Sequence, residues 1–216
     1  NDMLGRLHAQ SRGMRQFIAD AGHELRNPLA TLRVTLEFGD ESNRAALIEV
    51  DRLESLVADL LLLAKSDAAE TRDFTTVHVD EILRNAIEGL RVRRDDVNLK
   101  EEIAPGTVYG DPRALRSAFD NLISNAIRHA GHEVVVTGLN RNNAYLVVVT
   151  DDGAGLTPDD CSIVFERFVR LDEARNRDEG GSGLGLAIVA AIAHAHHGKV
   201  TAFPGPGGHF AFEVPK

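Results

Sequence analysis

The chain has 216 residues, of which 43% are hydrophobic and 26% are charged, proportions that are ordinary for a soluble globular protein. Its formal net charge is −9, and it contains no Trp and few other aromatic residues. This composition argues against a nucleic-acid partner, which would favour a basic surface or aromatic stacking platforms. A single cysteine, Cys161, excludes an internal disulfide, and the longest apolar run, Leu186–Ala193, is too short to cross a bilayer.

Residues 4–70 are predicted to form a helical hairpin. Apolar residues recur every three or four positions from Leu4 to Leu36 and again from Leu47 to Ala64, and Gly39-Asp40 separates the two runs. Two amphipathic helices leave one apolar face uncovered, so we expect two copies of the hairpin to pair as a four-helix bundle. The sequence therefore predicts a homodimer.

A second domain is predicted after a polar linker at Ser66–Asp73. Helical patterns there alternate with β-branched or aromatic runs, which favours an α/β domain over residues 75–216. The predicted strands include Val134–Thr137, Leu146–Thr150, Lys199–Phe203 and His209–Val214.

His23 is predicted to lie on the solvent side of the first helix. At 100° per residue it stands about 200° from Ala21 and from Leu25 in the apolar stripe, whereas Asn27 is only about 40° away from it. By position alone, a plain surface histidine is an equal alternative. An imidazole with a reference pKa near 6.5, next to the carboxylate of Glu24, is nevertheless a nucleophile suited to accept a phosphoryl group.

The string FIADAGHELRNPLATLR, residues 17–33, resembles the dimerisation and histidine-phosphotransfer helix of sensor histidine kinases. This resemblance implies that His23 is phosphorylated, that Glu24 assists as a base, and that Asn27 positions water for dephosphorylating a response regulator. The segment NDMLGRL at Asn1–Leu7 is similar to the end of a HAMP linker. It implies a longer protein with an upstream sensor, anchored in the bacterial inner membrane, whose cytoplasmic portion is this segment.

A polar stripe is predicted on a helix that begins at Pro112 and is capped by Asp111. Asn121, Asn125 and Arg128 share the side opposite the apolar face. Amide oxygens can ligate Mg²⁺ and an arginine can contact phosphates, although a solvated helix face is the alternative. The predicted core positions of this helix are Leu115, Ala118, Phe119, Leu122, Ile123, Ala126 and Ile127.

Two glycine-containing segments follow. In Asp151-Asp152-Gly153-Ala154-Gly155, the first carboxylate can accept a hydrogen bond from the exocyclic amine of adenine, and Gly153 and Gly155 permit close backbone approach; a plain glycine turn is the alternative. The run Gly180–Leu186 opens an apolar helix, whose free N–H groups would face phosphates. Its candidate residues are Gly181, Gly183, Leu184 and Gly185.

Residues 156–179 are too polar for a core. They are predicted to form a lid over a nucleotide bound at the two glycine-containing segments, with Phe165 and Phe168 as its anchors. An ordinary solvated loop is the alternative.

The strings DNLISNAIRHA, DDGAG, VFERFVRLD and GGSGLGLAI, in this order, resemble the ATP-binding domain of the same kinases, a Bergerat-type α/β sandwich. The resemblance implies ATP and Mg²⁺ as cofactors, with Asn125 and Asn121 as metal ligands. It also implies that Arg128 and His129 lie beside the nucleotide and that Arg170 contacts the phosphate being transferred. Arg175 is a weaker candidate for the role of Arg170. We therefore expect a HAMP-like end at 1–9, a phosphotransfer domain at 10–70 and an ATP-binding domain at 75–216.

The sequence departs from the family pattern at Gly22, where Ser is frequent, and at Arg128-His129, where Lys precedes Tyr or Phe. The second departure puts an aromatic contact to the nucleotide in doubt.

Two other functions compete with the kinase. An ATP hydrolase of the related chaperone and topoisomerase superfamily would carry a general-base Glu four residues before the metal-binding Asn, where this chain has Asn121. A dimeric scaffold that binds nucleotide without transfer is the other alternative. The intact set of His23, Glu24, Asn121, Asn125 and Asp151 argues against it.

Overall fold

The computed structural model describes Leu29, Val50, Leu53 and Val57 and the ranges 74–91, 94, 96–171 and 182–216. The chain divides into two compact units, Asn1–Ala64 and Lys65–Lys216. In the first unit the four described residues are all helical, as the predicted hairpin requires.

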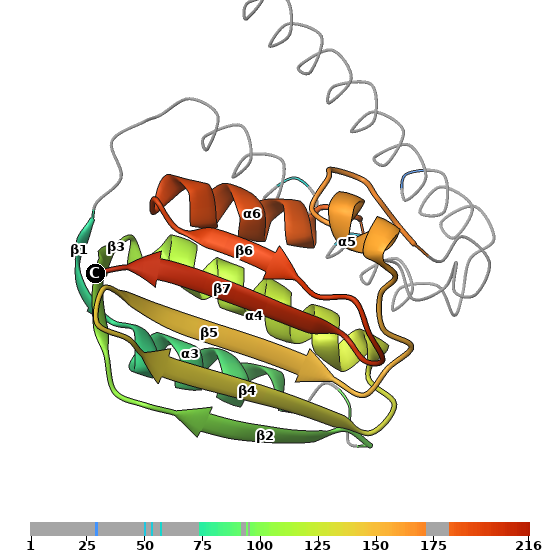
Figure 1. Cartoon of the computed structure of the whole chain (residues 1–216), viewed down its shortest axis with the longest axis horizontal. Helices are drawn as coiled ribbons and strands as arrows, with labels where there is room; N and C mark the ends of the chain where they lie inside the picture. The colour runs from blue at the N-terminus through green and yellow to red at the C-terminus, as the bar shows by residue number, and fades with distance from the viewer. Residues whose placement is uncertain are drawn as a thin grey trace, which may run out of the picture. The chain divides into compact units, whose positions relative to one another are not determined.

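The second unit is an α/β sandwich, as the sequence predicts (Figure 1). Its elements are β1 (Thr75–His78), α3 (Val79–Leu90), β2 (Asn98–Ile103), β3 (Thr107–Gly110), α4 (Pro112–His129), β4 (Glu133–Asn140), β5 (Ala144–Asp151), α5 (Pro158–Ile163), α6 (Gly185–Ala195), β6 (Lys199–Ala202) and β7 (His209–Pro215).

Five strands form the main sheet in the order β2-β4-β5-β7-β6, and β1 pairs with β3 in a separate antiparallel ribbon. The β2–β4 pair is parallel and the other three pairs are antiparallel. Helices α3, α4 and α6 lie on one face of the sheet (Figure 1). The order of the strands brings the end of β5 next to the start of β7, where Thr150 pairs with His209.

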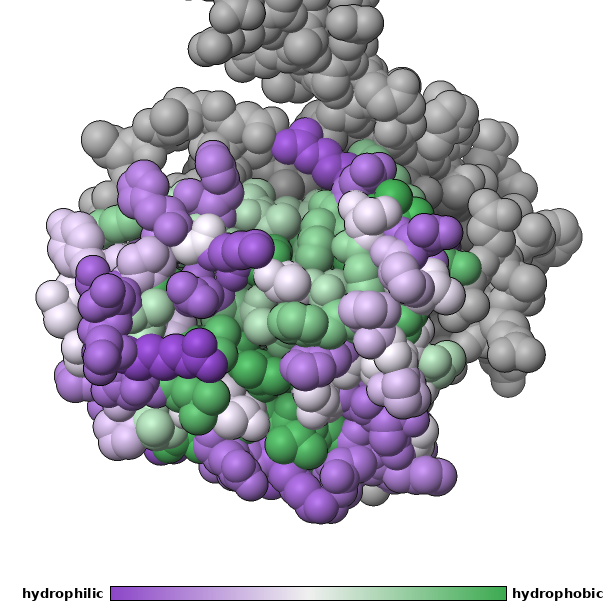
Figure 2. Space-filling view, viewed as in Figure 1, coloured by the Kyte–Doolittle hydropathy of each residue, from purple (hydrophilic) through white to green (hydrophobic). Residues whose placement is uncertain are grey.

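Alternation along the strands fixes which side chains reach the core between sheet and helices. Val134 and Val136 of β4 are fully buried, whereas Val135 and Thr137 point to the other face and are half-buried. Figure 2 shows that other face, on which apolar side chains gather at the middle of the sheet within a polar surround. Burial of each large apolar side chain contributes roughly 1.5–3 kcal/mol, so the helix-covered face dominates the stability of the unit.

Among the described residues, no helix is long and apolar enough to span a bilayer.

Candidate nucleotide-binding site

Helix α4 carries the predicted polar stripe in the predicted register. The Oδ1 atom of Asp111 accepts hydrogen bonds from the backbone N–H groups of Arg113 at 2.9 Å and Ala114 at 3.1 Å, and Pro112 is the first helical residue. The cap contributes about 1 kcal/mol to stability. Burial of the apolar face fixes which side of the helix points to the core. All seven predicted core positions of this helix are buried: Leu115, Ala118, Phe119, Leu122, Ile123, Ala126 and Ile127.

Asn121 and Asn125 are half-buried on the side of α4 away from that core. The Nδ2 group of Asn121 donates to the carbonyl of Ser117 at 2.9 Å. Its Oδ1 atom lies against the start of α6, only 2.7 Å from where a Cβ atom on Gly185 would stand. In the part of the chain that the structure describes, the amide of Asn125 has no hydrogen-bond partner, so both its oxygen and its nitrogen can meet a ligand.

Asp151 ends β5 and is 9% exposed. Its Oδ1 atom accepts backbone N–H bonds from Gly153 at 2.9 Å and from Gly208 at 3.0 Å. These two bonds fix the carboxyl group, and Oδ2 accepts no hydrogen bond from any described residue. The arrangement leaves a fixed carboxylate with one oxygen able to accept a bond from a ligand.

The glycines of the 151–155 segment are required by close approach on two sides. A Cβ atom on Gly153 would collide with the carbonyl oxygen of His129, at the end of α4. Gly155 has a φ of 81°, and a Cβ there would collide with the carbonyl of Gly205, in the connection between β6 and β7. Leu156 pairs with the same Gly205 through two backbone hydrogen bonds. The segment is therefore held between α4 and the β6–β7 connection.

The glycine-rich segment also lies beside the predicted lid. The N–H of Phe168 donates to the carbonyl of Gly183 at 2.9 Å, and a Cβ atom on Gly183 would come within 2.8 Å of the Cα of Phe168. Both residues have positive φ values, 69° for Gly183 and 64° for Phe168. Helix α6 begins at Gly185, and no side chain caps its N-terminus at Leu184. Its first N–H groups are therefore not satisfied by a capping side chain.

The first half of the predicted lid is not simply a loop. Residues 158–163 form helix α5, whose capping box pairs Thr157 with Asp160 through bonds of 3.2 Å and 2.9 Å. Phe165 contacts Phe210 of β7 edge to face, with ring centroids 6.3 Å apart. Sequence reasoning recognised the anchoring aromatic residue but missed the helix, although Thr-x-x-Asp with Pro at the first position is a start signal.

The remaining predicted residues are either exposed or outside the described part of the chain. Arg170, Arg128 and His129 are exposed, and the latter two end α4. His23, Glu24, Asn27, Gly181 and Arg175 lie outside the described residues.

Gly208 contacts the candidate residue Asp151 but was not predicted from the sequence, where Pro204–Gly208 reads only as a turn. Its N–H holds Asp151, and a Cβ atom there would collide with the Oδ2 of that residue. The Gly207-Gly208 pair directly before a strand was the available signal.

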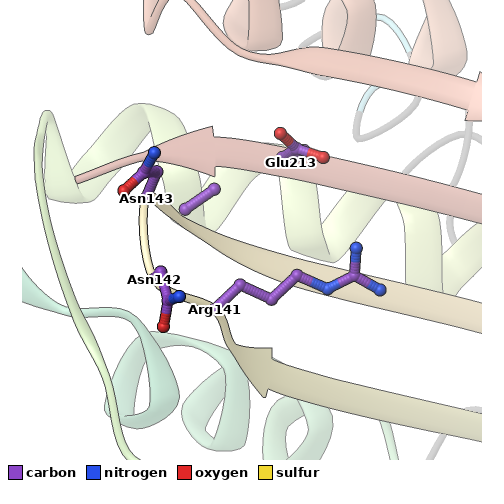
Figure 3. A pocket seen from close by; sticks show the side chains of 5 residues that line it. Arg141, Asn142, Asn143 and Glu213 are labelled. Atoms are coloured by element: carbon purple, nitrogen blue, oxygen red, sulfur yellow. The ribbon is translucent and has the colours of Figure 1, made fainter.

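A surface hollow of about 470 Å³ lies elsewhere, at the turn between β4 and β5 (Figure 3). It is lined by Arg141, Asn142, Asn143, Ala144 and Glu213, and the side chain of Arg141 extends along the sheet. Ala144 and Asp151 are the two ends of β5, so this hollow lies far from the predicted site residues.

Two parts of the chain match known protein families. Residues 110–216 match the family of histidine kinase-, DNA gyrase B- and HSP90-like ATPases, and residues 13–69 match the histidine kinase A phosphoacceptor domain. The probable sensor histidine kinase TcrY of Mycobacterium tuberculosis is 36% identical over 98% of this chain and 48% of its own length. The chain thus spans about half the length of this relative.

Two solved structures are similar. The mycobacterial sensor histidine kinase MprB is 30% identical with a TM-score of 0.59, over 66% of this chain and 97% of that one. Full-length ShkA in complex with AMPPNP is 27% identical with a TM-score of 0.66, over 93% of this chain and 45% of that one. The chain belongs to the sensor histidine kinases of two-component systems and carries their phosphoacceptor and ATP-binding regions.

Proposed function

We propose that this chain binds Mg·ATP at the site formed by α4, the 151–155 segment and the start of α6, and transfers the γ-phosphoryl group to His23. The single observation that carries the proposal is the meeting of these three segments. Asn121 lies against Gly185, and Gly153 lies against the end of α4. Two segments that follow α4 in sequence, one of them more than 60 residues after Asn121, are thus packed against this helix.

Adenine recognition is assigned to Asp151. One of its oxygens is taken by two backbone N–H groups, and the other is available to accept the exocyclic amine. Gly153, Gly155 and Phe165 would shape the base pocket. The AMPPNP bound to the similar ShkA structure supports a nucleotide in this fold. The phosphates are assigned to the start of α6, through Gly181, Gly183, Leu184 and Gly185, and Arg128 and His129 would flank them.

The donors present fit Mg²⁺. Asn125 has an amide with no partner among the described residues, and amide oxygens are hard ligands of the kind this ion accepts. Asn121 would be the second ligand, since its Nδ2 is committed to Ser117 and its oxygen is not. When bound, the ion would neutralise charge on the phosphates.

His23 is proposed as the nucleophile. One imidazole nitrogen attacks the γ-phosphorus, the bond to the β–γ bridging oxygen breaks, and ADP leaves with that electron pair. Glu24 holds the proton of the other nitrogen, and Arg170 is assigned to the charge on the phosphoryl group in flight. The phosphoryl group then passes to an aspartate of a response regulator, and Asn27 would support the reverse, phosphatase, activity.

A homodimer through residues 10–70 is proposed. Leu29, Val50 and Val57, all members of the predicted apolar stripes, are 53%, 37% and 44% exposed in a single chain. Pairing two hairpins would cover them. We further propose that residues 1–9 continue a HAMP-like linker, that residues 75–216 bind ATP, and that the parent protein is anchored in the bacterial inner membrane with this portion in the cytoplasm.

Incubation with γ-labelled ATP tests the function. We expect acid-labile label on the wild-type chain, no label on His23→Gln, and no nucleotide binding by Asp151→Asn. Label that persists in His23→Gln, or that survives acid, contradicts the assignment of the phosphoacceptor.

A further inference from the structure

Three consecutive backbone N–H groups after α4 converge on the carboxylate of Asp152. Its Oδ1 atom accepts bonds from Gly131 at 2.8 Å, His132 at 2.9 Å and Glu133 at 3.0 Å. Its Oδ2 atom accepts a further bond from His132 at 3.0 Å. Successive N–H groups of this kind form a concave anion site, here filled by a side chain of the protein itself. The backbone N–H of Asp152 also donates to the carbonyl of Glu133 at 3.2 Å.

The carbonyl side of the same helix end is held separately. Arg94 donates from Nη1 to the carbonyls of Ile127 at 3.2 Å and Ala130 at 3.1 Å, and its guanidinium is paired with Asp96. A cation at the last carbonyls and an anion at the N–H groups beyond them both complement the local dipoles. The turn that follows α4 is therefore fixed from two directions, by Arg94 and by Asp152.

The position of Asp152 makes this turn relevant to the nucleotide. Asp151, which precedes it, is the residue assigned to adenine, and His129, two residues before the turn, lies one helical turn after Asn125. Gly153, which follows it, already touches the carbonyl of His129. Residues 151–153 are thus joined to the end of α4 and the turn after it. On the side of the helix and turn, all of the groups involved belong to the backbone.

We propose that Asp152 is a positioning residue for nucleotide binding, which sets the distance between Asp151 and the asparagines of α4. The inference rests on the proposed function of those residues. Asp152 is assigned a supporting role and not a ligand role, because four hydrogen bonds from three backbone N–H groups already hold its two oxygens. Its effect reaches the nucleotide only through the segment that it holds.

The same hydrogen bonds affect the charge state of Asp152. The N–H groups of Glu133, His132 and Gly131 lower the pKa of Asp152, against a smaller opposing effect of burial. The carboxylate is therefore ionised at neutral pH, as the anion site requires.

The experiment measures the Kd for ADP by calorimetry, and unfolding by urea, on the full chain. Asp152→Ala is on the surface and should fold, but its affinity should fall about tenfold or more, which is the cost typical of removing a support of a ligand-binding group. Asp152→Asn should stay within about twofold of wild type, because its amide oxygen can still accept the bonds made by Oδ1.

Asp80→Asn is the matched control. Asp80 also accepts a backbone N–H, from Gly106 at 3.1 Å, but near Tyr145, at the opposite end of β5 from Asp151. This variant should lower the urea midpoint and leave the Kd unchanged.

Two results would overturn the inference: a wild-type Kd in Asp152→Ala, or an equal loss of affinity in Asp152→Asn and Asp152→Ala. A parallel loss of affinity in Asp80→Asn would also overturn it, because general destabilisation would then explain the effect. Wild-type affinity in Asp151→Asn would instead refute the proposed role of Asp151, which makes the two failures distinguishable.

Discussion

The side-chain oxygen of Asn121 lies against Gly185, so that helices α4 and α6 meet at an amide and a glycine. A Cβ atom at Gly185 would stand 2.7 Å from that oxygen, closer than the two atoms can pack. The glycine therefore determines where the Asn121 amide rests.

Gly185→Ala should weaken nucleotide binding without unfolding the domain. The Asn121 side chain is flexible and can rotate away at little cost, and Ala favours the helix by about 0.5–1 kcal/mol over Gly. We expect unchanged or slightly higher stability together with an affinity for Mg·ATP that falls roughly tenfold, as when a supporting partner is lost.

The matched variant for this prediction is Ala190→Gly, in the same helix and away from Asn121. It should lose about 0.5–1 kcal/mol of stability and keep its affinity. Calorimetric titration measures the affinity of both variants, and urea unfolding measures their stability. We expect Gly185→Ala to lose affinity alone and Ala190→Gly to lose stability alone. Wild-type affinity in Gly185→Ala would exclude Asn121 from the site.

The start and the buried face of helix α4 could be predicted because their determinants are local. Asp111 and Pro112 mark its start, and a core position every three or four residues gives its phase. Strand β2 could not be predicted in the same way. Its sequence NLKEEI buries only Leu99, and its place at the edge of the sheet comes from parallel pairing with β4, which begins 35 residues after Asn98.

The site was only partly predictable for the same reason. Asn125, Asp151 and the glycines stand in recognisable strings, so their presence could be inferred from sequence. The residues that hold these side chains in place could not be inferred from sequence. Gly208 reaches Asp151 across 57 residues and His196 reaches Asp111 across 85, and no local pattern carries contacts between residues that far apart.

His196 should be a structural residue of the ATP-binding unit. It is 3% exposed, its Nε2 accepts the N–H of Asp111 at 3.0 Å, and its Nδ1 lies 2.8 Å from the carbonyl of Ile192. Its ring stacks on Phe74 with centroids 4.7 Å apart. His196→Ala removes a buried ring and leaves the Asp111 N–H without its acceptor, so we expect a loss of about 2–4 kcal/mol.

His194→Ala is the control for this loss, because His194 is exposed in the last turn of α6, just before the C-cap residue His196. Its unfolding free energy should stay within about 0.5 kcal/mol of wild type. Urea unfolding at pH 7.5 measures both. Equal effects of the two substitutions would contradict the role assigned to the buried ring.

Tyr145 should make the stability of the domain fall at alkaline pH. Its hydroxyl donates to the carbonyl of Ala104 at 2.6 Å, and burial, with a contribution from the charge of Asp80, raises its pKa from 10.0 to about 12. The folded state thus favours the neutral phenol. The resulting stability is complete below pH 10 and is lost as the pH rises from about 10 to about 12.

Tyr109→Phe leaves Tyr145 as the sole tyrosine of the chain, since the sequence contains two. Phenolate absorbance of that variant should titrate with a midpoint near 12 while the protein is folded. Tyr145→Phe should cost about 1–2 kcal/mol at neutral pH, because a buried hydrogen bond is lost. An absorbance midpoint near 10 in the folded variant would contradict the buried, hydrogen-bonded phenol.

Gly153→Ala should damage both the fold and the nucleotide site. The added Cβ atom would meet the carbonyl oxygen of His129, a backbone atom that cannot move without displacing the end of α4. Because the N–H of Gly153 also holds the Oδ1 of Asp151, relief of the collision would release that carboxylate. We expect a loss of more than about 2 kcal/mol in unfolding free energy. We also expect no measurable ATP binding.

Gly131 is the control position for Gly153→Ala. A Cβ atom there would stand 3.5 Å from the carboxylate of Asp152, an ordinary packing distance, and its φ lies outside the left-handed region. Gly131→Ala should therefore keep its nucleotide affinity. Gly131 lies in the turn after α4, and Gly153 packs against the end of the same helix. Calorimetry on the two variants therefore shows whether ATP binding depends on the close backbone approach at Gly153 or is lost with any substitution in this region. Retained ATP binding in Gly153→Ala would mean that the end of α4 and the 151–155 segment can separate without loss of the site.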